Sequence, residues 1–323
     1  MSDTPKTDVV EEKKRKPRGI PIETATIDHI LPTVYVLGMS GGKDSSAVWL
    51  WYMNESGLPK DRLHITFNNT HNEDQATYDH IHKMSAQSVA WGGPPITWLE
   101  PALGFLDLAI KKKRFPSTKR RFCTQHLKMF PSQKYVLGLM NQGLRPILLT
   151  GVRANESFER SKLTDREFDL FYCAEVWRPI LKWTLEDVVA IHKKYNFPLN
   201  PLYAMGAKRV GCFPCINSAK GEIRAMAKYR PERIDELRRW ELMVKPSRDG
   251  MFSSFFPRNK VPLPLRTKEI TTATGEKMKV ATIDDVVLWS KTERGGKQFS
   301  FDLEPEWTED KFIACNSSLG ACE

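Results

Sequence analysis

Short apolar runs alternate with longer stretches of helical periodicity over the first two thirds of the chain. The apolar runs fall at residues 34–37, 63–67, 96–99 and 146–152, and their β-branched and aromatic content predicts four strands. Between them, apolar residues recur every three or four positions, which predicts helices. The predicted helices begin after Gly42, at about 75, after 101, and at 125, 185 and 231.

This alternation predicts a doubly wound α/β fold, whose ligands bind beyond the carboxyl ends of the parallel strands. From about residue 245 the pattern changes to proline-rich segments and short β-like pieces near 280, 286–289 and 299–303. We therefore expect a basic flexible tail (1–24), an α/β domain (25–244) and a small irregular C-terminal extension (245–323) with short β segments and a cysteine pair.

The charge balance points to anionic partners. The 323 residues include 49 Lys and Arg against 39 Asp and Glu, a net charge of +10, which favours nucleotides or nucleic acid. Basic runs at 13–18 and 111–121 either contact phosphates or form solvated faces. Neither a membrane-spanning run nor a secretory signal is recognisable, so we expect a cytoplasmic protein with no membrane partner.

The turn after the first strand is the strongest candidate site. Its consecutive glycines allow backbone N–H groups to curl around an anion, and the following helix N-terminus adds partial positive charge. Lys43 adds a full charge, and Asp44 suits Mg²⁺ or a ribose hydroxyl. The turn is not a Walker A loop, because Ser or Thr does not follow its Gly-Lys pair. We expect Lys43 and Asp44 to be catalytic and the following residues to bind a nucleotide: Ser40, Gly41, Gly42, Lys43, Asp44 and Ser45.

The sequence SGGKDS at 40–45 resembles the PP-loop of ATP pyrophosphatases, a Rossmann-like superfamily. Further motifs over about 34–224 are similar to those of the phosphoadenosine phosphosulfate (PAPS) reductase family. They are Asn69-Thr70-His71-Asn72-Glu73, Gly151-x-Arg153 with Ser157 and Arg160, Arg178-Pro179, Asn200-Pro201-Leu202-Tyr203, and Gly211-Cys212-x-x-Cys215. The resemblance implies that Arg153 and Arg160 clamp a phosphate or sulfate. Asn69 and His71 depart from the Asp and Gly of the family.

Six cysteines in such a chain are more typical of metal ligands, redox groups or core residues than of disulfides. In the iron–sulfur branch of the resembled family, a Cys-Cys pair and a later C-x₂-C pair bind a [4Fe–4S] cluster. Here Phe122 replaces the first of these cysteines. The resemblance therefore implies Cys123, Cys212 and Cys215 as ligands, with a fourth position open or filled from elsewhere.

Other arrangements of the cysteines remain open. Cys315 and Cys322 are spaced so that, with the C-x₂-C pair, they would complete a Cys₄ zinc site. Unligated core or surface thiols are the third arrangement. We expect Cys173 to be a buried core residue, and His80 to be a polar surface group.

Two activities fit the resemblance. PP-loop enzymes of DNA phosphorothioation and tRNA thiolation imply ATP-dependent sulfur transfer, which releases AMP and pyrophosphate and uses Mg²⁺, a cysteine desulfurase-type sulfur donor and a nucleic-acid acceptor. The alternative is a sulfonucleotide reductase that releases sulfite from adenylyl sulfate. The complete loop, the basic charge and the lack of a C-terminal Glu-Cys-Gly-x-His motif favour sulfur transfer. A non-catalytic nucleotide-binding subunit is a third possibility.

Overall fold

The computed structural model describes residues 19–21, 31–244, 252–257, 260–271 and 275–293. Most of the predicted tail, the β-like piece at 299–303, and both Cys315 and Cys322 lie outside these residues. Within them, no helix is both long and apolar enough to cross a bilayer.

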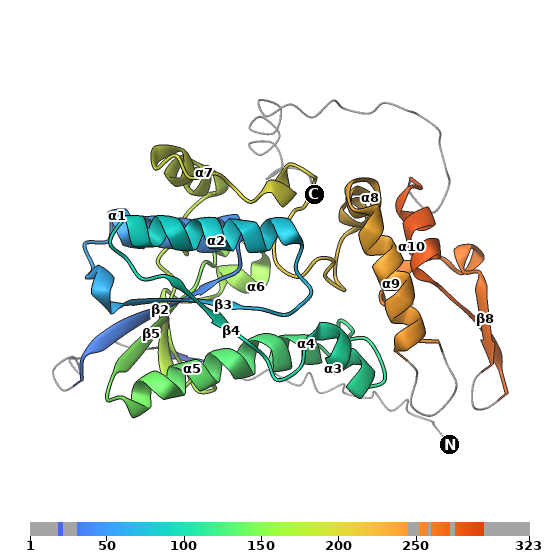
Figure 1. Cartoon of the computed structure of the whole chain (residues 1–323), viewed down its shortest axis with the longest axis horizontal. Coiled ribbons are helices and arrows are strands. Elements are labelled where there is room, and N and C mark those ends of the chain that lie inside the picture. Colours follow the sequence, from blue (N-terminus) through green and yellow to red (C-terminus); the bar gives the residue numbers. More distant parts are fainter. Residues whose placement is uncertain (1–18, 22–30, 245–251, 258–259, 272–274, 294–323) are drawn as a thin grey trace, which may run out of the picture.

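A mostly parallel sheet forms the centre of the protein (Figure 1). Five neighbouring strands pair in parallel, and β6 runs antiparallel to both of its neighbours, β1 and β7. In spatial order they are β1 (Gly19–Pro21), β6 (Arg166–Asp169), β7 (Ala174–Trp177), β5 (Arg145–Leu149), β2 (Thr33–Met39), β3 (Leu63–Asn68) and β4 (Ile96–Leu99). The predicted α/β fold is therefore confirmed.

Helices cover both faces of the sheet (Figure 1). One face carries α1 (Lys43–Asn54), α2 (Gln75–Ala90) and α7 (Leu185–Lys194), and the other carries α3 (Phe105–Lys111), α4 (Phe122–Thr124) and α5 (Phe130–Asn141). On the first face Leu37 and Ile65 of the sheet pack against Trp49 and Leu50 of α1, all of them fully buried. On the second face Val36 and Leu148 pack against Val136 of α5.

Short irregular elements connect the main ones. A π-helical turn, Gln125–Met129, joins α4 to α5 without a break. Such turns interrupt regular helices mostly at functional sites. The remaining short elements are α6 (Phe158–Ser161) and the 3₁₀ turns Lys60–Arg62, Ala154–Glu156, Pro201–Tyr203 and Leu263–Leu265.

A second group of elements lies at one end of the sheet (Figure 1). It consists of α8 (Lys220–Tyr229), α9 (Pro231–Met243), α10 (Ile283–Ser290) and the hairpin of β8 (Lys268–Thr271) and β9 (Lys277–Val280). Phe105 of α3, Trp240 of α9 and Phe255 share one hydrophobic core with α10. α10 thus packs directly onto α8 and α9, while the proposed three-part division of the chain stays a prediction.

The β-like interpretation of 286–289 is wrong, because these residues belong to α10. The helix begins at a capping box in which Thr282 Oγ1 accepts from Asp285 N, and the Asp285 side chain accepts from Thr282 N. An apolar run of four residues does not by itself distinguish a strand from a buried helix.

A buried carboxyl group holds this second group of elements together. Glu241 of α9 is 4% exposed and accepts hydrogen bonds from Phe255 N at 2.8 Å and from Ile283 N at 3.0 Å. Burial raises the pKa of Glu241 to about 7, against the opposing effect of these hydrogen bonds.

We predict that the free energy of unfolding falls as pH rises from about 4.5 to about 7, because native Glu241 keeps a proton that the unfolded chain releases. The contribution is on the order of 3 kcal/mol. Glu241→Gln cannot titrate and should remove this slope, while Glu232→Gln, an exposed change on the same helix, should leave it intact. Urea unfolding across this pH range measures it; an unchanged slope in Glu241→Gln would contradict the prediction.

Candidate functional site

The glycine loop lies between the end of β2 and the start of α1, at the carboxyl edge of the sheet. Gly41 has φ of +73°, a left-handed conformation that favours glycine, and a Cβ there would stand 3.1 Å from Thr77 Cγ2. Ser45 Oγ donates to Gly42 O at 3.0 Å and lies 3.1 Å from Ser40 Oγ. The loop is therefore closed by its own side chains into a fixed shape.

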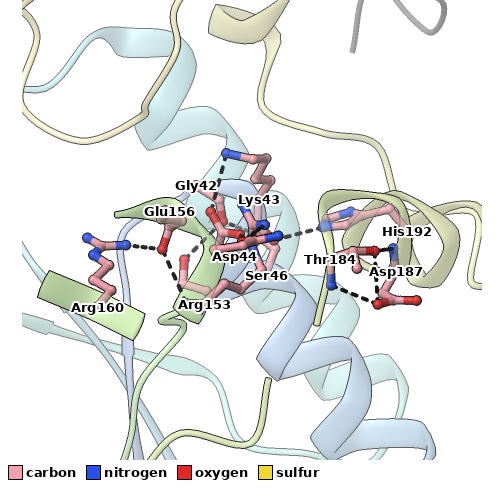
Figure 2. Close-up of polar contacts among 12 residues, drawn as sticks. Gly42, Lys43, Asp44, Ser46, Arg153, Glu156, Arg160, Thr184, Asp187 and His192 are labelled. Carbon is pink, nitrogen blue, oxygen red and sulfur yellow. Dashed lines mark hydrogen bonds and ion pairs between the residues drawn. The ribbon is translucent and has the colours of Figure 1, made fainter. Parts of the chain in front are cut away.

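Asp44 is the centre of a group of cations (Figure 2). Arg153 Nε donates to Asp44 Oδ1 at 2.6 Å, and Lys43 Nζ lies 3.3 Å from Asp44 Oδ2. Arg160 is paired with Glu156. The two arginines that the resemblance implies as anion clamps thus lie beside the loop, each held by a carboxylate.

An open cleft of about 550 Å³ adjoins the loop. Ser40, Gly42, Lys43, Asp44, Ser45 and Arg160 are among the predicted residues that line it. Gly41 and Arg153 are not among its lining residues. The cleft also contains Thr150, whose hydroxyl is buried without a hydrogen-bond partner and is available to a ligand.

Arg209 also lines the cleft, and the sequence analysis missed it. It is close enough to Arg160 to influence that residue's ionisation. Burial lowers the pKa of Arg160, Asp44 raises it, and Arg209 and Arg153 lower it further. The cleft lining thus holds four cations (Lys43, Arg160, Arg178 and Arg209) together with four carboxylates (Asp44, Glu156, Glu167 and Asp169).

His192 and Tyr203 support the loop from behind; the sequence analysis missed His192 and gave Tyr203 only as part of a motif, without a role. His192 is 4% exposed; its Nε2 lies 3.1 Å from Lys43 O and its Nδ1 lies 3.1 Å from Phe197 O (Figure 2). Tyr203 accepts a hydrogen bond from Lys43 N at 3.0 Å, and burial raises the pKa of its phenol. These contacts fix the Lys43 peptide, and they arise from segments about 150 residues away in sequence.

The turn after β3 explains the two departures from the resembled family. His71 has φ of +56°, the left-handed conformation in which the family has Gly, and its ring pairs with Glu100 at 2.7 Å. Asn69 Nδ2 donates to Glu100 Oε1 at 2.9 Å, and Asn69 Oδ1 accepts from Tyr78. Both side chains are engaged within the protein, so this turn has a structural role here.

Three cysteines gather near this turn. Cys123 is the middle residue of α4, and Cys212 and Cys215 lie in the loop before α8. Thr70 Oγ1 is 3.4 Å from Cys212 Sγ. Burial raises the pKa of the Cys123 thiol, and Cys212 and Cys215 raise it further. Cys123 and Cys215 also pack against the same hydrophobic core, so the three thiols lie in one region of the protein.

Lys128, in the π-helical turn, lies in the same region. The Cys212 thiolate is the strongest influence on Lys128 and raises its pKa, while burial opposes this. Among the described residues, no three His, Cys, Asp or Glu side chains are positioned to hold a metal ion. The metal ligands therefore stay a prediction, as do Cys315 and Cys322, which lie outside the described residues.

Two expectations about single residues are wrong. Cys173 is exposed, at a turn where its φ is +52°. His80 is 5% exposed, and its burial lowers its pKa to about 4. The sequence analysis did not derive the exposure of Cys173 or the burial of His80 from hydrophobic periodicity.

We predict that His192→Phe weakens pyrophosphate binding roughly tenfold, because it removes a buried hydrogen bond to Lys43 O. His192→Gln retains a donor and should bind within a few-fold of the wild type. Isothermal calorimetry measures both, with Lys193→Ala, an exposed change on the same helix, as the control. Equal affinity of His192→Phe and the wild type would show that the Lys43 peptide is held without His192.

The comparisons with known proteins agree with this geometry. The family described as phosphoadenosine phosphosulfate reductase domain matches residues 34–218, more than half of the chain. An uncharacterized 37.8 kDa protein of Escherichia phage 186 is 31% identical over 335 residues, which covers 90% of this chain and 97% of that protein.

Better-characterised relatives match over shorter stretches. The adenosine 5'-phosphosulfate reductase of Allochromatium vinosum is 30% identical over 96 residues, 30% of this chain and 35% of the reductase. The phosphoadenylyl-sulfate reductase of Candida auris, solved with phosphate, is 19% identical with a TM-score of 0.43, covering 56% of this chain and 82% of the other. On the strength of the family match and the phage relative, the chain belongs to the PAPS reductase family and carries its PP-loop domain.

Proposed function

We propose that the protein is an ATP-dependent sulfur-transfer enzyme that cleaves ATP between the α- and β-phosphates. One observation carries the proposal: the loop amides, Lys43, Arg160 and Arg209 face a single cleft around Asp44. A pyrophosphate leaving group carries several negative charges, which such preorganised cations and N–H groups stabilise.

Different residues of the cleft have different roles in the proposed cleavage of ATP. The loop N–H groups and Lys43 bind the β- and γ-phosphates and stabilise the charge that develops on the departing oxygen. Arg160 and Arg209 orient the α-phosphate for attack by the acceptor. Asp44 fits a magnesium ion, because Mg²⁺ commonly takes one or two carboxylates together with phosphate oxygens and water. A ligand at Asp44 competes with Arg153, which frees that guanidinium for phosphate.

The cysteine cluster fits a thiolate-bound iron–sulfur centre in its chemistry. Cys123, Cys212 and Cys215 are the residues that would hold it, and the nearby Lys128 suits the net negative charge of such a centre. When bound, the cluster supplies a soft site for sulfur. Zinc is the alternative, and it requires Cys315 and Cys322.

A basic surface beside Cys123 supports a nucleic-acid acceptor. All seven Lys and Arg residues of the run 111–121 are exposed. In the described part of the chain none of them forms an ion pair with a carboxylate, whereas Arg145, Arg166 and Arg178 of the sheet region do. An unneutralised run of cations favours a polyanion such as a nucleic-acid backbone. The immediate sulfur donor remains a desulfurase-type enzyme or a small sulfur compound.

The test of the proposed function is the identity of the products. We expect AMP and pyrophosphate from ATP, measured by chromatography of anaerobically purified protein with sulfide and either DNA or RNA. Lys43→Ala should lower the rate by at least about a hundredfold, because it removes a cation that stabilises the leaving group. Lys83→Ala, an exposed lysine on α2, should have no effect.

Other products would identify other functions. ADP and phosphate would contradict the proposed cleavage. Sulfite released from an adenylyl sulfate would make the protein a sulfonucleotide reductase. Tight ATP binding without turnover in any mixture would indicate a non-catalytic subunit.

We predict that nucleic-acid affinity falls linearly with the logarithm of salt concentration. The double change Lys119→Ala with Arg120→Ala should reduce the slope by roughly 1.4 to 1.8 if both residues contact phosphates. The matched control is Lys83→Ala with Lys193→Ala, which removes the same charge from helices on the opposite face of the sheet (Figure 1). Fluorescence anisotropy measures the affinity of each variant as a function of salt. If the Lys119/Arg120 variant and the wild type have the same slope, these residues do not contact nucleic acid.

A further inference from the structure

A second, smaller cavity of about 200 Å³ lies between the cysteine loop and α8. Its lining includes Lys128, Cys212 and Cys215, with Met205 and Ala225 on opposite walls. The helix that closes it, α8, begins at Lys220, beyond the region 34–218 that matches the family. This cavity is therefore formed in part by residues outside the family match.

The two cavities are adjacent but separate. Arg209 and Val210 line both of them, so this short segment is their common wall. Cys212 and Cys215 line only the smaller cavity, and among the described residues no cysteine lines the nucleotide cleft. A small molecule that approaches these two thiols therefore does so through the smaller cavity, and the nucleotide cleft is reached from the other side of the wall.

The lining indicates the chemistry of the ligand. Lys128 makes no hydrogen bond or ion pair within 4 Å with a carboxylate of the described residues, and Glu73 and Cys212 offset only part of its charge from a distance. Arg230 also lines the cavity, but Asp74 neutralises it at 2.8 Å. Much of the remaining wall is apolar, including Leu202 and Met226. A small, weakly hydrated anion suits this mixture, and the volume is too small for a nucleotide.

We propose that this cavity, the sulfur pocket, binds a small sulfur anion of the size of hydrosulfide or thiosulfate beside Cys212 and Cys215. The inference rests on the proposed sulfur-transfer function, for which it supplies the donor's point of entry. Nucleotide and sulfur donor then occupy opposite sides of the wall at Arg209 and Val210. Each reactant can bind without displacing the other.

The test fills the sulfur pocket by enlarging a side chain of α8 that lines it. Ala225 Cβ lies 3.5 Å from the position that a Cβ on Gly206 would take, so it points at the facing loop. Ala225→Phe should fill the pocket and weaken binding of the anion by roughly tenfold or more. Gly221→Phe is the matched control, because a Cβ on Gly221 meets nothing within 4 Å. Met205→Trp blocks from the opposite wall and should reproduce the loss.

Anaerobic calorimetry of the purified holoprotein uses hydrosulfide, thiosulfate and, for comparison, sulfate as probes. We expect hydrosulfide or thiosulfate to bind more tightly than sulfate, and the one that binds identifies the donor as free sulfide or sulfane sulfur. Loss in both blocking variants, with retention in Gly221→Phe, supports the pocket. Equal affinity in all variants, or no affinity for either sulfur anion, overturns it.

Cleavage of ATP by the same preparations separates the two proposals. If the wild type and both blocked variants form AMP but no protein binds a sulfur anion, the pocket fails and the proposed cleavage stands. If the anions bind as expected but no variant cleaves ATP, the pocket stands as a binding site and the proposed function fails. If the unfolding transition shows that Ala225→Phe does not fold, the affinity of Met205→Trp for the sulfur anions tests the pocket instead.

Discussion

The contact between the turn after β5 and the first turn of α1 is the constraint on which the site depends. A Cβ on Gly151 would stand 2.7 Å from backbone atoms of both Asp44 and Ser45, so only glycine permits this approach. The same approach brings Arg153, two residues later, onto Asp44 at 2.6 Å. Close packing of the Gly151 backbone against α1 thus assembles the anion site, and the Arg153 and Asp44 side chains complete it.

The elements beyond the family match extend this site. Arg233 of α9 donates from Nε to Phe213 O at 2.8 Å, which fixes the peptide between Cys212 and Cys215. Arg230 reaches back to Asp74, at the start of α2. Because the cysteine loop is held between α2 and α9, a disturbance of either helix should reach the thiols. The core around Trp240 and Phe255 supplies the rigidity that these contacts need.

The sequence predicted what depends on local pattern, and missed what depends on long-range packing. The glycine loop and its strand and helix are contiguous, so the strand predicted at 34–37 and the helix start after Gly42 agree with β2 (33–39) and α1 (43–54). The short strands β6 and β7 were missed, because four residues each are too few for a period. His192 and Arg209 reach the site only through the fold. No motif marks them: the role of His192 follows from its contact with Lys43 O, and that of Arg209 from its place in the cleft lining.

The separation of the two cavities has a chemical consequence for the proposed sulfur transfer. In the proposed reaction the activated acceptor in the larger cleft is the electrophile, and a sulfur anion must reach it at one position. Placing the thiols behind Arg209 and Val210 restricts that encounter to one boundary. Arg209 is the cation at that boundary, so its guanidinium can meet the α-phosphate on one side and an incoming anion on the other. Sulfur transfer then depends on the passage of sulfur from the sulfur pocket to the nucleotide cleft at Arg209 and Val210.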